Sequence, residues 1–205
     1  IMSSIVVAIA GGTGSGKTFL TNNLKKKYLK EEILILHQDS YYNDISYMEY
    51  NNRCKQNFDH PNAIDIDLIK KHLKGLRNGQ IIKVPSYDFK SHLRVNNTRK
   101  TYKHKIIIIE GILMLHYQKL HKFYSLKVFI DSPEDIRINR RIKRDMKFRG
   151  RTYDSIQSQY KNTVKPMHDK YVTPSKKYAD IIIDGSDKID DSVIKIKKKI
   201  DILLT

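Results

Sequence analysis

The fold is decided by a stretch of eight residues, Gly11-Gly12-Thr13-Gly14-Ser15-Gly16-Lys17-Thr18. It matches G-x-x-x-x-G-K-[ST] at every fixed position, and it lies between an apolar run at Ile5–Ala10 and a helical pattern at Phe19–Lys30. Glycines let backbone N–H groups converge on phosphate oxygens, and the N-terminus of the following helix favours an anion. We therefore expect a nucleoside triphosphate site, with Lys17 on the β- and γ-phosphates and Thr18 on Mg²⁺.

Outward from this loop, apolar β-branched runs alternate with helical patterns. The expected strands are Ile5–Ala10, Ile33–Gln38, Ile106–Glu110, Leu126–Asp131 and Ile181–Asp184. The further expected helices are Asp65–Arg77, Pro133–Asp145, Ser155–His168 and Ser192–Leu204. Strands this apolar are typical of a parallel sheet covered by helices on both faces.

One segment breaks the alternation. Gln80–Tyr102 has short alternating stretches and polar turns, and it contains the aromatic residues Tyr87 and Phe89. We expect it to form a small β-hairpin inserted into the α/β unit. The chain of 205 residues is then one domain, an α/β fold with a five-stranded parallel sheet of the P-loop NTPase type.

Composition narrows the function classes. The single cysteine, Cys54, excludes an intramolecular disulfide and a four-cysteine zinc site, and it fits a reducing, cytoplasmic compartment. No apolar run approaches the ~20 residues of a membrane span, and we expect no secretory signal peptide. The net charge of +17 comes with abundant Lys, Ile, Asn and Tyr along the whole chain, the mixture that AT-rich coding produces. We therefore do not expect nucleic acid to be the main partner.

Two carboxylates follow strands of the predicted sheet. Glu110 ends the strand Ile106–Glu110, and Asp39 follows Ile33–Gln38. The carboxyl ends of parallel strands face the ligand crevice of such a sheet, so both side chains are expected near Lys17. Glu110 could hold a magnesium ion, and Asp39 could share it or accept a proton from an attacking hydroxyl. The chain has no Asn-Lys-x-Asp motif, which argues against a GTPase.

A basic helix is the third feature. Its arginines recur at helical spacing and continue into an Arg-Gly-Arg turn; they are Arg137, Arg140, Arg141, Arg144, Arg149 and Arg151. An all-basic face without paired acids repels itself and becomes favourable when a polyphosphate neutralises it. The alternatives are a solvated basic helix or an RNA-binding stripe. We expect a closing element over residues 146–153, with Gly150 permitting a bend.

Together these motifs resemble the uridine kinase (uridine–cytidine kinase) family of P-loop kinases. Beyond the phosphate loop, the matching stretches run in order over nearly the whole chain: QDSYY at 38–42, NFDHPNAID at 57–65, YDFKSHLR at 87–94, IIEGIL at 108–113, RINRRIKRD at 137–145, RGR at 149–151, SQY at 158–160, TVKPM at 163–167 and PSKKYADIII at 174–183.

The resemblance implies a role for each matching residue. Asp39 is the expected general base, Lys17 and Arg144 are the other expected catalytic residues, and Thr18, Asp39 and Glu110 are the expected magnesium shell. ATP is the expected donor, bound by residues 11–18 with Arg140, Arg144, Arg149 and Asp187. The expected substrates are uridine and cytidine, phosphorylated at the ribose 5′-hydroxyl. Their expected site comprises Asp39, Tyr42, Phe58, Asp59, Tyr87, Phe89, His92, Arg141, Arg151 and Gln159.

Within this site the resemblance assigns Asp59 to the ribose 2′- and 3′-hydroxyls, which predicts a preference for ribonucleosides. It assigns Tyr87 and His92 to the edge of the pyrimidine and Phe89 to its plane. It also implies a cytoplasmic homotetramer and feedback inhibition by UTP or CTP.

One segment departs from the family. After the last strand the family commonly has a Pro–basic–Gly stretch, whereas this chain has the acidic Asp184–Asp187. The contacts to the donor base are therefore open. Three other functions also remain open at this point: a phosphoribulokinase-like or pantothenate kinase-like enzyme, a nucleotide-binding regulator, and a basic RNA-binding protein.

Overall fold

The computed structural model describes residues 4–205, and of residues 96 and 97 it describes only the backbone. Five strands form one sheet in the order β2-β5-β1-β6-β7, and every neighbouring pair is parallel. The strands are β1 (Ile5–Gly11), β2 (Ile33–His37), β5 (Ile106–Glu110), β6 (Leu126–Asp131) and β7 (Ile181–Asp184). The predicted parallel sheet and all five of its strands are confirmed.

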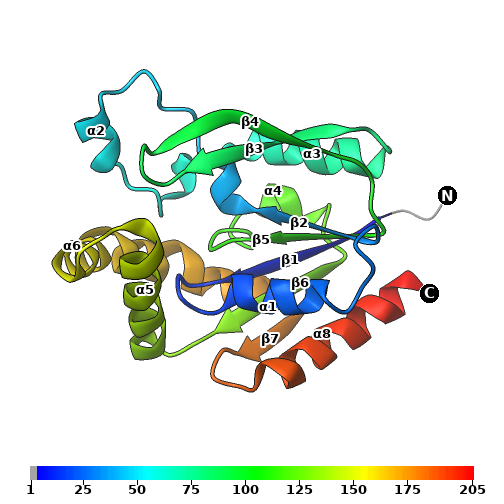
Figure 1. The fold of residues 1–205 in the computed structure, drawn as a ribbon. Coiled ribbons are helices and arrows are strands. Elements are labelled where there is room, and N and C mark those ends of the chain that lie inside the picture. The colour runs from blue at the N-terminus through cyan, green and yellow to red at the C-terminus, as the bar shows by residue number, and fades with distance from the viewer. Residues whose placement is uncertain (1–3) are drawn as a thin grey trace.

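Helices cover both faces of the sheet (Figure 1). The helices are α1 (Lys17–Lys25), α2 (Tyr50–Cys54), α3 (Ile66–Arg77), α4 (Gln118–His121), α5 (Glu134–Arg149), α6 (Tyr153–Gln159), α7 (Lys165–Met167) and α8 (Ile189–Leu204). Two of these, α2 and α4, are short and lack the periodicity that would have predicted them.

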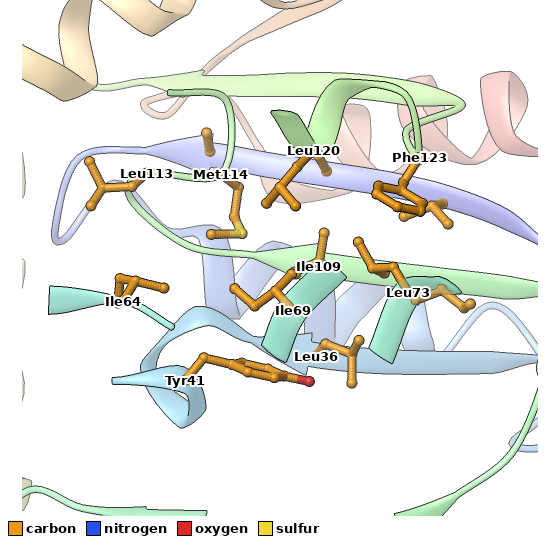
Figure 2. Packing of buried hydrophobic residues seen from close by; sticks show 14 of the residues in the cluster. Leu36, Tyr41, Ile64, Ile69, Leu73, Ile109, Leu113, Met114, Leu120 and Phe123 are labelled. Atoms are coloured by element: carbon orange, nitrogen blue, oxygen red, sulfur yellow. The ribbon is translucent and has the colours of Figure 1, made fainter. Parts of the chain in front are cut away.

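The buried core is split by the sheet into two clusters. Because side chains alternate along a strand, Ile5, Val7 and Ile9 of β1 face α1 and α8, whereas Val6, Ala8 and Ala10 face α3 and α4. On the second side Ile69 and Leu73 of α3 pack on Leu36 and Ile109 of the sheet (Figure 2). Both faces are therefore sealed by apolar contacts, and the strand ends are left to carry polar groups.

A second, two-stranded sheet stands beside the first. It is the predicted hairpin, formed by β3 (Ile82–Asp88) and β4 (Leu93–Thr101) in antiparallel pairing. The register shifts between Val84 and Ser86, where Pro85 has no N–H to donate to the ladder. At the hairpin turn His92 takes the left-handed backbone conformation, with φ of 56°.

The segment after α6 continues as an irregular helix. Two π-helical turns, Tyr160–Val164 and His168–Val172, flank α7, and Pro166 within α7 cannot donate a helical N–H. The predicted helix Ser155–His168 is thus present, but its middle part is π-helical and not α-helical. No helix in the described residues is long and apolar enough to cross a membrane.

Candidate active site

The phosphate loop joins β1 to α1 as the sequence predicts. Gly14 and Gly16 have φ of 75° and 100°, a region that favours glycine, and Gly16 caps the N-terminus of α1. The Lys17 ammonium donates to the carbonyl oxygens of Gly11 and Gly12, both at 2.8 Å. An ammonium has three N–H donors, so one remains for a ligand, and Lys17 is already oriented by the loop.

The Lys17 side chain is buried with its charge. Burial lowers its pKa to about 8, although the nearby carboxylates Glu110 and Asp39 oppose this shift. A buried cation with two neutral carbonyl partners is poorly compensated. An anion at the loop would supply the missing charge.

Glu110 lies at the end of β5, beside the loop. Its Oε1 accepts from the Thr18 hydroxyl at 3.2 Å and lies 2.7 Å from His37 Nδ1. Burial opposes its ionisation, but the bonds from His37 and Thr18 and the charge of Lys17 outweigh it, so the pKa of Glu110 lies below its usual range. The side chain is therefore a buried carboxylate.

Asp39 follows β2 on a short 3-10 turn, Gln38–Tyr41. The Tyr42 hydroxyl donates to its Oδ1 at 3.3 Å. Asp39, Glu110 and Thr18 line the same cavity, so the structure brings together the three oxygen ligands predicted for magnesium. Hard oxygen donors of this kind suit Mg²⁺, which takes most of its other ligands from phosphates and water. No cluster of three or more His, Cys, Asp or Glu suited to a metal occurs in the described part of the chain.

This cavity has a volume of about 670 Å³ and runs from the phosphate loop to the hairpin. All ten residues predicted to bind substrate line it: Asp39, Tyr42, Phe58, Asp59, Tyr87, Phe89, His92, Arg141, Arg151 and Gln159. It is also lined by Thr13, Lys17, Thr18, Arg144 and Arg149 from the predicted ATP set. Segments far apart in the sequence therefore meet in one space.

An aromatic cluster forms the hairpin end of the cavity. The Phe58 and His92 rings stack at 5.0 Å with an interplanar angle of 11°. The Tyr87 ring lies 4.8 Å from Tyr42 and 5.3 Å from Phe89. These aromatic side chains line the cavity with ring faces and edges, and the Tyr87 hydroxyl has no hydrogen-bond partner within the described residues.

Asp59 lies between this cluster and the arginines. Burial raises its pKa, and the charge of Arg141 opposes the rise. A half-buried carboxylate that accepts no side-chain donor among the described residues has both oxygens available for a ligand's hydroxyls.

The expectation that the basic face of α5 has no paired acid is wrong. Asp145 is fully buried on α5, and it pairs with Arg144 at 2.7 Å and with Arg141 and Arg149 at 3.5 Å. The face is therefore not without paired acids, because Asp145 falls at i+4 from Arg141 and beside Arg144. One carboxylate compensates three arginines only in part, and the group keeps an excess of positive charge facing the cavity.

Of the remaining predicted arginines, Arg141 and Arg151 line the large cavity, whereas Arg140 does not. Arg141 donates to Thr13 Oγ1 at 3.0 Å and to Gln159 Oε1 at 2.7 Å, and Arg151 also donates to Gln159. Arg140 instead points its guanidinium to the Gly185 carbonyl at 3.1 Å. It lines a separate cavity on the other side of the loop.

This second cavity measures about 300 Å³ and has a largely apolar wall. Its lining includes Ser15, Gly16, Phe19, Leu20, Arg140, Ile183, Gly185 and the predicted Asp187. A Cβ on Gly185 would lie 1.7 Å from Ser132 Oγ, so only glycine fits there. Gly11, Gly12 and Gly14 line neither cavity and shape the loop between them.

Several lining residues escaped sequence reasoning. Tyr50 and Cys54 line the larger cavity from α2, a helix that no sequence pattern predicted. Arg53 of the same helix donates to the Ser91 carbonyl at 3.0 Å and so holds α2 against the hairpin turn. His37 belongs to no motif, so no sequence pattern predicts its bond to Glu110.

Comparison with known proteins places the chain among kinases. The model of the phosphoribulokinase/uridine kinase family matches residues 6–190. The chain is 46% identical to the uridine kinase of Clostridium novyi over 97% of both chains, and 43% identical to that of Staphylococcus haemolyticus over 95% of both.

Two solved structures share the fold at low sequence identity. A possible uridine kinase from Bacillus stearothermophilus has a TM-score of 0.56 at 20% identity, covering 90% of each chain. A putative fructose transport system kinase from Silicibacter sp. has a TM-score of 0.70 at 16% identity, covering 88% of this chain and 90% of the other.

Proposed function

Because the chain belongs to the phosphoribulokinase/uridine kinase family, we propose that it transfers the γ-phosphoryl group of ATP to the 5′-hydroxyl of uridine or cytidine. The products are ADP and UMP or CMP. The observation that carries the proposal is the single cavity that joins the phosphate loop to the aromatic hairpin pocket. A donor phosphate and a nucleoside can meet within it.

The acceptor is argued from the shape and chemistry of the hairpin end. Tyr42, Phe58, Tyr87 and Phe89 offer ring faces and edges to a planar base, and they offer little to a sugar phosphate or to pantothenate. The neighbouring Asp59 can accept from both the 2′- and the 3′-hydroxyl. A deoxyribonucleoside would leave part of that carboxylate unpaired, which costs binding energy.

In the proposed mechanism the chain works mainly by position and charge. Asp39 accepts the proton of the 5′-hydroxyl as that oxygen attacks the γ-phosphorus, and the bond from phosphorus to the β–γ bridging oxygen breaks. The remaining N–H of Lys17 stabilises the phosphate oxygens, and Arg144 and Arg149 face the same charge from α5. Thr18, Asp39 and Glu110 would hold Mg²⁺, which neutralises phosphate charge when bound.

The donor base is assigned to the second cavity, beyond the phosphate loop. Its apolar lining and the Arg140 guanidinium at its rim suit a purine ring. The polar side chains in its lining are two serines, Asp184, Asp187 and Arg140, and none of them is an amide that could read the edge of one particular base. We propose that the donor range is broader than ATP alone for this reason.

An ADP-release assay with Mg·ATP tests the proposal. The acceptors are uridine, cytidine, deoxycytidine, adenosine and pantothenate. We expect turnover with uridine and cytidine and at most weak turnover with the others. Turnover with pantothenate or adenosine in preference to uridine would contradict the acceptor assignment. Binding of ATP without turnover of any acceptor would favour a regulatory protein.

A further inference from the structure

Arg137 is a buried cation that lines neither cavity. It lies one helical turn before Arg140 and Arg141 on α5, with 5% of its surface exposed. Its Nε donates to the Ser132 carbonyl at 3.0 Å. Its Nη1 has no hydrogen-bond partner in the described part of the chain. Glu134, the acid one turn earlier, already pairs with Lys165 at 2.9 Å.

The free nitrogen lies against the phosphate loop. A Cβ placed on Gly12 would be 2.9 Å from Arg137 Nη1 and 2.8 Å from the His168 ring. A Cβ on Gly14 would be 2.2 Å from the Arg137 carbonyl oxygen. At Gly14 the loop therefore packs directly on the backbone of α5, and at Gly12 it packs on the Arg137 and His168 side chains.

His168 brings neither a negative charge that would balance Arg137 nor a positive charge of its own. Burial, aided by the positive charge of Arg137, lowers its pKa to about 4, so the ring is neutral at physiological pH. Its Nδ1 is also buried without a partner among the described residues. The charge of Arg137 contributes to the lowered pKa of Lys17, after burial and the effect of Arg144, so its field reaches the loop.

A buried guanidinium without a carboxylate partner is costly unless an anion compensates it. Glu134 supplies part of that counter-charge, since it and Arg137 interact electrostatically, and a phosphate bound at the loop would supply more of it from the other side of the Gly12 backbone. We propose that Arg137 is a positioning residue for the donor: a fixed positive charge behind Gly12 that stabilises the bound triphosphate through the loop. This rests on the proposed function in so far as the loop binds a nucleoside triphosphate.

The test compares phosphate-bearing ligands with ligands that lack phosphate. Arg137→Gln removes the charge, Arg137→Lys keeps it, and Lys143→Gln removes a charge from an exposed position of the same helix. Dissociation constants are measured by calorimetry for ATP, inorganic tripolyphosphate, adenosine and uridine. We expect Arg137→Gln to weaken ATP and tripolyphosphate at least about tenfold, or ~1.4 kcal/mol. Adenosine and uridine should be unaffected, and Arg137→Lys should restore most of the lost affinity.

Three results would overturn the proposal. The first is unchanged affinity for ATP and tripolyphosphate in Arg137→Gln. The second is an equal loss for all four ligands, which would indicate a structural role only. The third is an equal effect of Lys143→Gln, which would mean that net charge, not position, is responsible.

A measurement on the wild-type chain covers the case in which Arg137→Gln does not fold. With ¹⁵N-labelled arginine, the Arg137 side-chain signal is assigned by its loss in Arg137→Lys. It should shift when tripolyphosphate is added, and an unmoved signal at saturation would refute the proposal. Intact ATP binding without turnover of uridine would instead contradict the proposed function and leave the role of Arg137 standing.

Discussion

Among single residues, two glycines of the phosphate loop occupy positions at which the motif accepts any residue. The motif allows any residue at positions 12 and 14, yet both are tightly confined here. Gly12 faces His168 and Arg137, and Gly14 faces the Arg137 carbonyl with a φ of 75°. The glycines are therefore required by the packing of α5 and the π-helical segment and not by the phosphate chemistry alone.

Gly12→Ala should weaken ATP binding. The added methyl group would overlap the His168 ring and Arg137 Nη1, and overpacking of this kind costs about 1–3 kcal/mol, or ~5–150-fold in affinity if the loop shifts. Calorimetry with ATP measures the effect. Gly79→Ala is the matched control, because it adds backbone strain at φ of 75° with nothing within 4 Å. ATP affinity equal in the two variants would show that crowding at Gly12 is unimportant.

Asp39→Asn should retain binding of ATP and uridine but lose turnover by about 10²–10⁴-fold, because an amide cannot accept the hydroxyl proton. The change keeps the size of the side chain and an oxygen for the Tyr42 hydroxyl. Single-turnover kinetics with uridine measures the chemical step. Asp44→Asn is the control, since Asp44 is exposed and accepts from the Ser46 N–H. Turnover within a few-fold of wild type would remove Asp39 as the base.

At the scale of elements, the hairpin and the helices carry separate parts of the site. The turn between β3 and β4 places His92 over Phe58, and the guanidinium of Arg149 lies 4.1 Å from the Phe89 ring centroid. α5 and the hairpin thus touch across the cavity. If residues 146–153 close over the cavity as predicted, their movement would make and break this contact with the hairpin.

His92→Asn should weaken uridine binding by about tenfold, through loss of the imidazole and its stack, while ATP binding stays unchanged. Asparagine accepts the left-handed conformation at this position, with φ of 56°. His92→Ala should weaken uridine similarly but leave the protein less stable than His92→Asn, because asparagine visits the left-handed conformation more readily than alanine. Binding and thermal unfolding separate the two effects. Equal weakening of uridine and ATP by His92→Asn would contradict the hairpin pocket.

A buried histidine on α3 predicts how stability depends on pH. Tyr41 Oη lies 3.0 Å from His72 Nδ1, and burial lowers the His72 pKa to about 4. In the unfolded chain the pKa returns to ~6.5, so the unfolded state binds the proton first as the pH falls. Stability should therefore decrease between about pH 6.5 and pH 4.

Chemical denaturation at pH 7 and pH 5 measures this loss. His72→Gln keeps a partner for the Tyr41 hydroxyl but cannot titrate, so it should lose less stability than wild type over the same interval. An identical loss in both proteins would show that His72 is not responsible. His168 has a pKa lowered in the same direction and accounts for part of the remaining dependence.

At the scale of the whole molecule, one chain contains both proposed ligand sites, and assembly is a separate question. The resemblance predicts a homotetramer, and α8 carries the exposed apolar side chains Ile194, Ile202 and Leu203. Light scattering during size-exclusion chromatography should give about four times the chain mass of 24.1 kDa. A mass of a single chain at micromolar concentration would contradict the tetramer.

Local sequence patterns are enough to predict the sheet, the phosphate loop and the kinds of side chain in the site. These follow from local pattern: continuous apolar runs for Ile106–Ile109, a glycine motif at residues 11–18, and carboxylates at strand ends. The large number of matching stretches, in order over nearly the whole chain, also indicated the family.

The partners that the arginines of α5 meet on other elements are visible in the folded chain alone. Arg140 turns to Gly185, and Arg137 turns to Gly12, although their spacing alone places them on one helical face with Arg141. Helical periodicity gives the direction in which a side chain leaves its helix. The neighbour that it meets depends on the packing of other elements, and hence on long-range contacts that no local pattern contains.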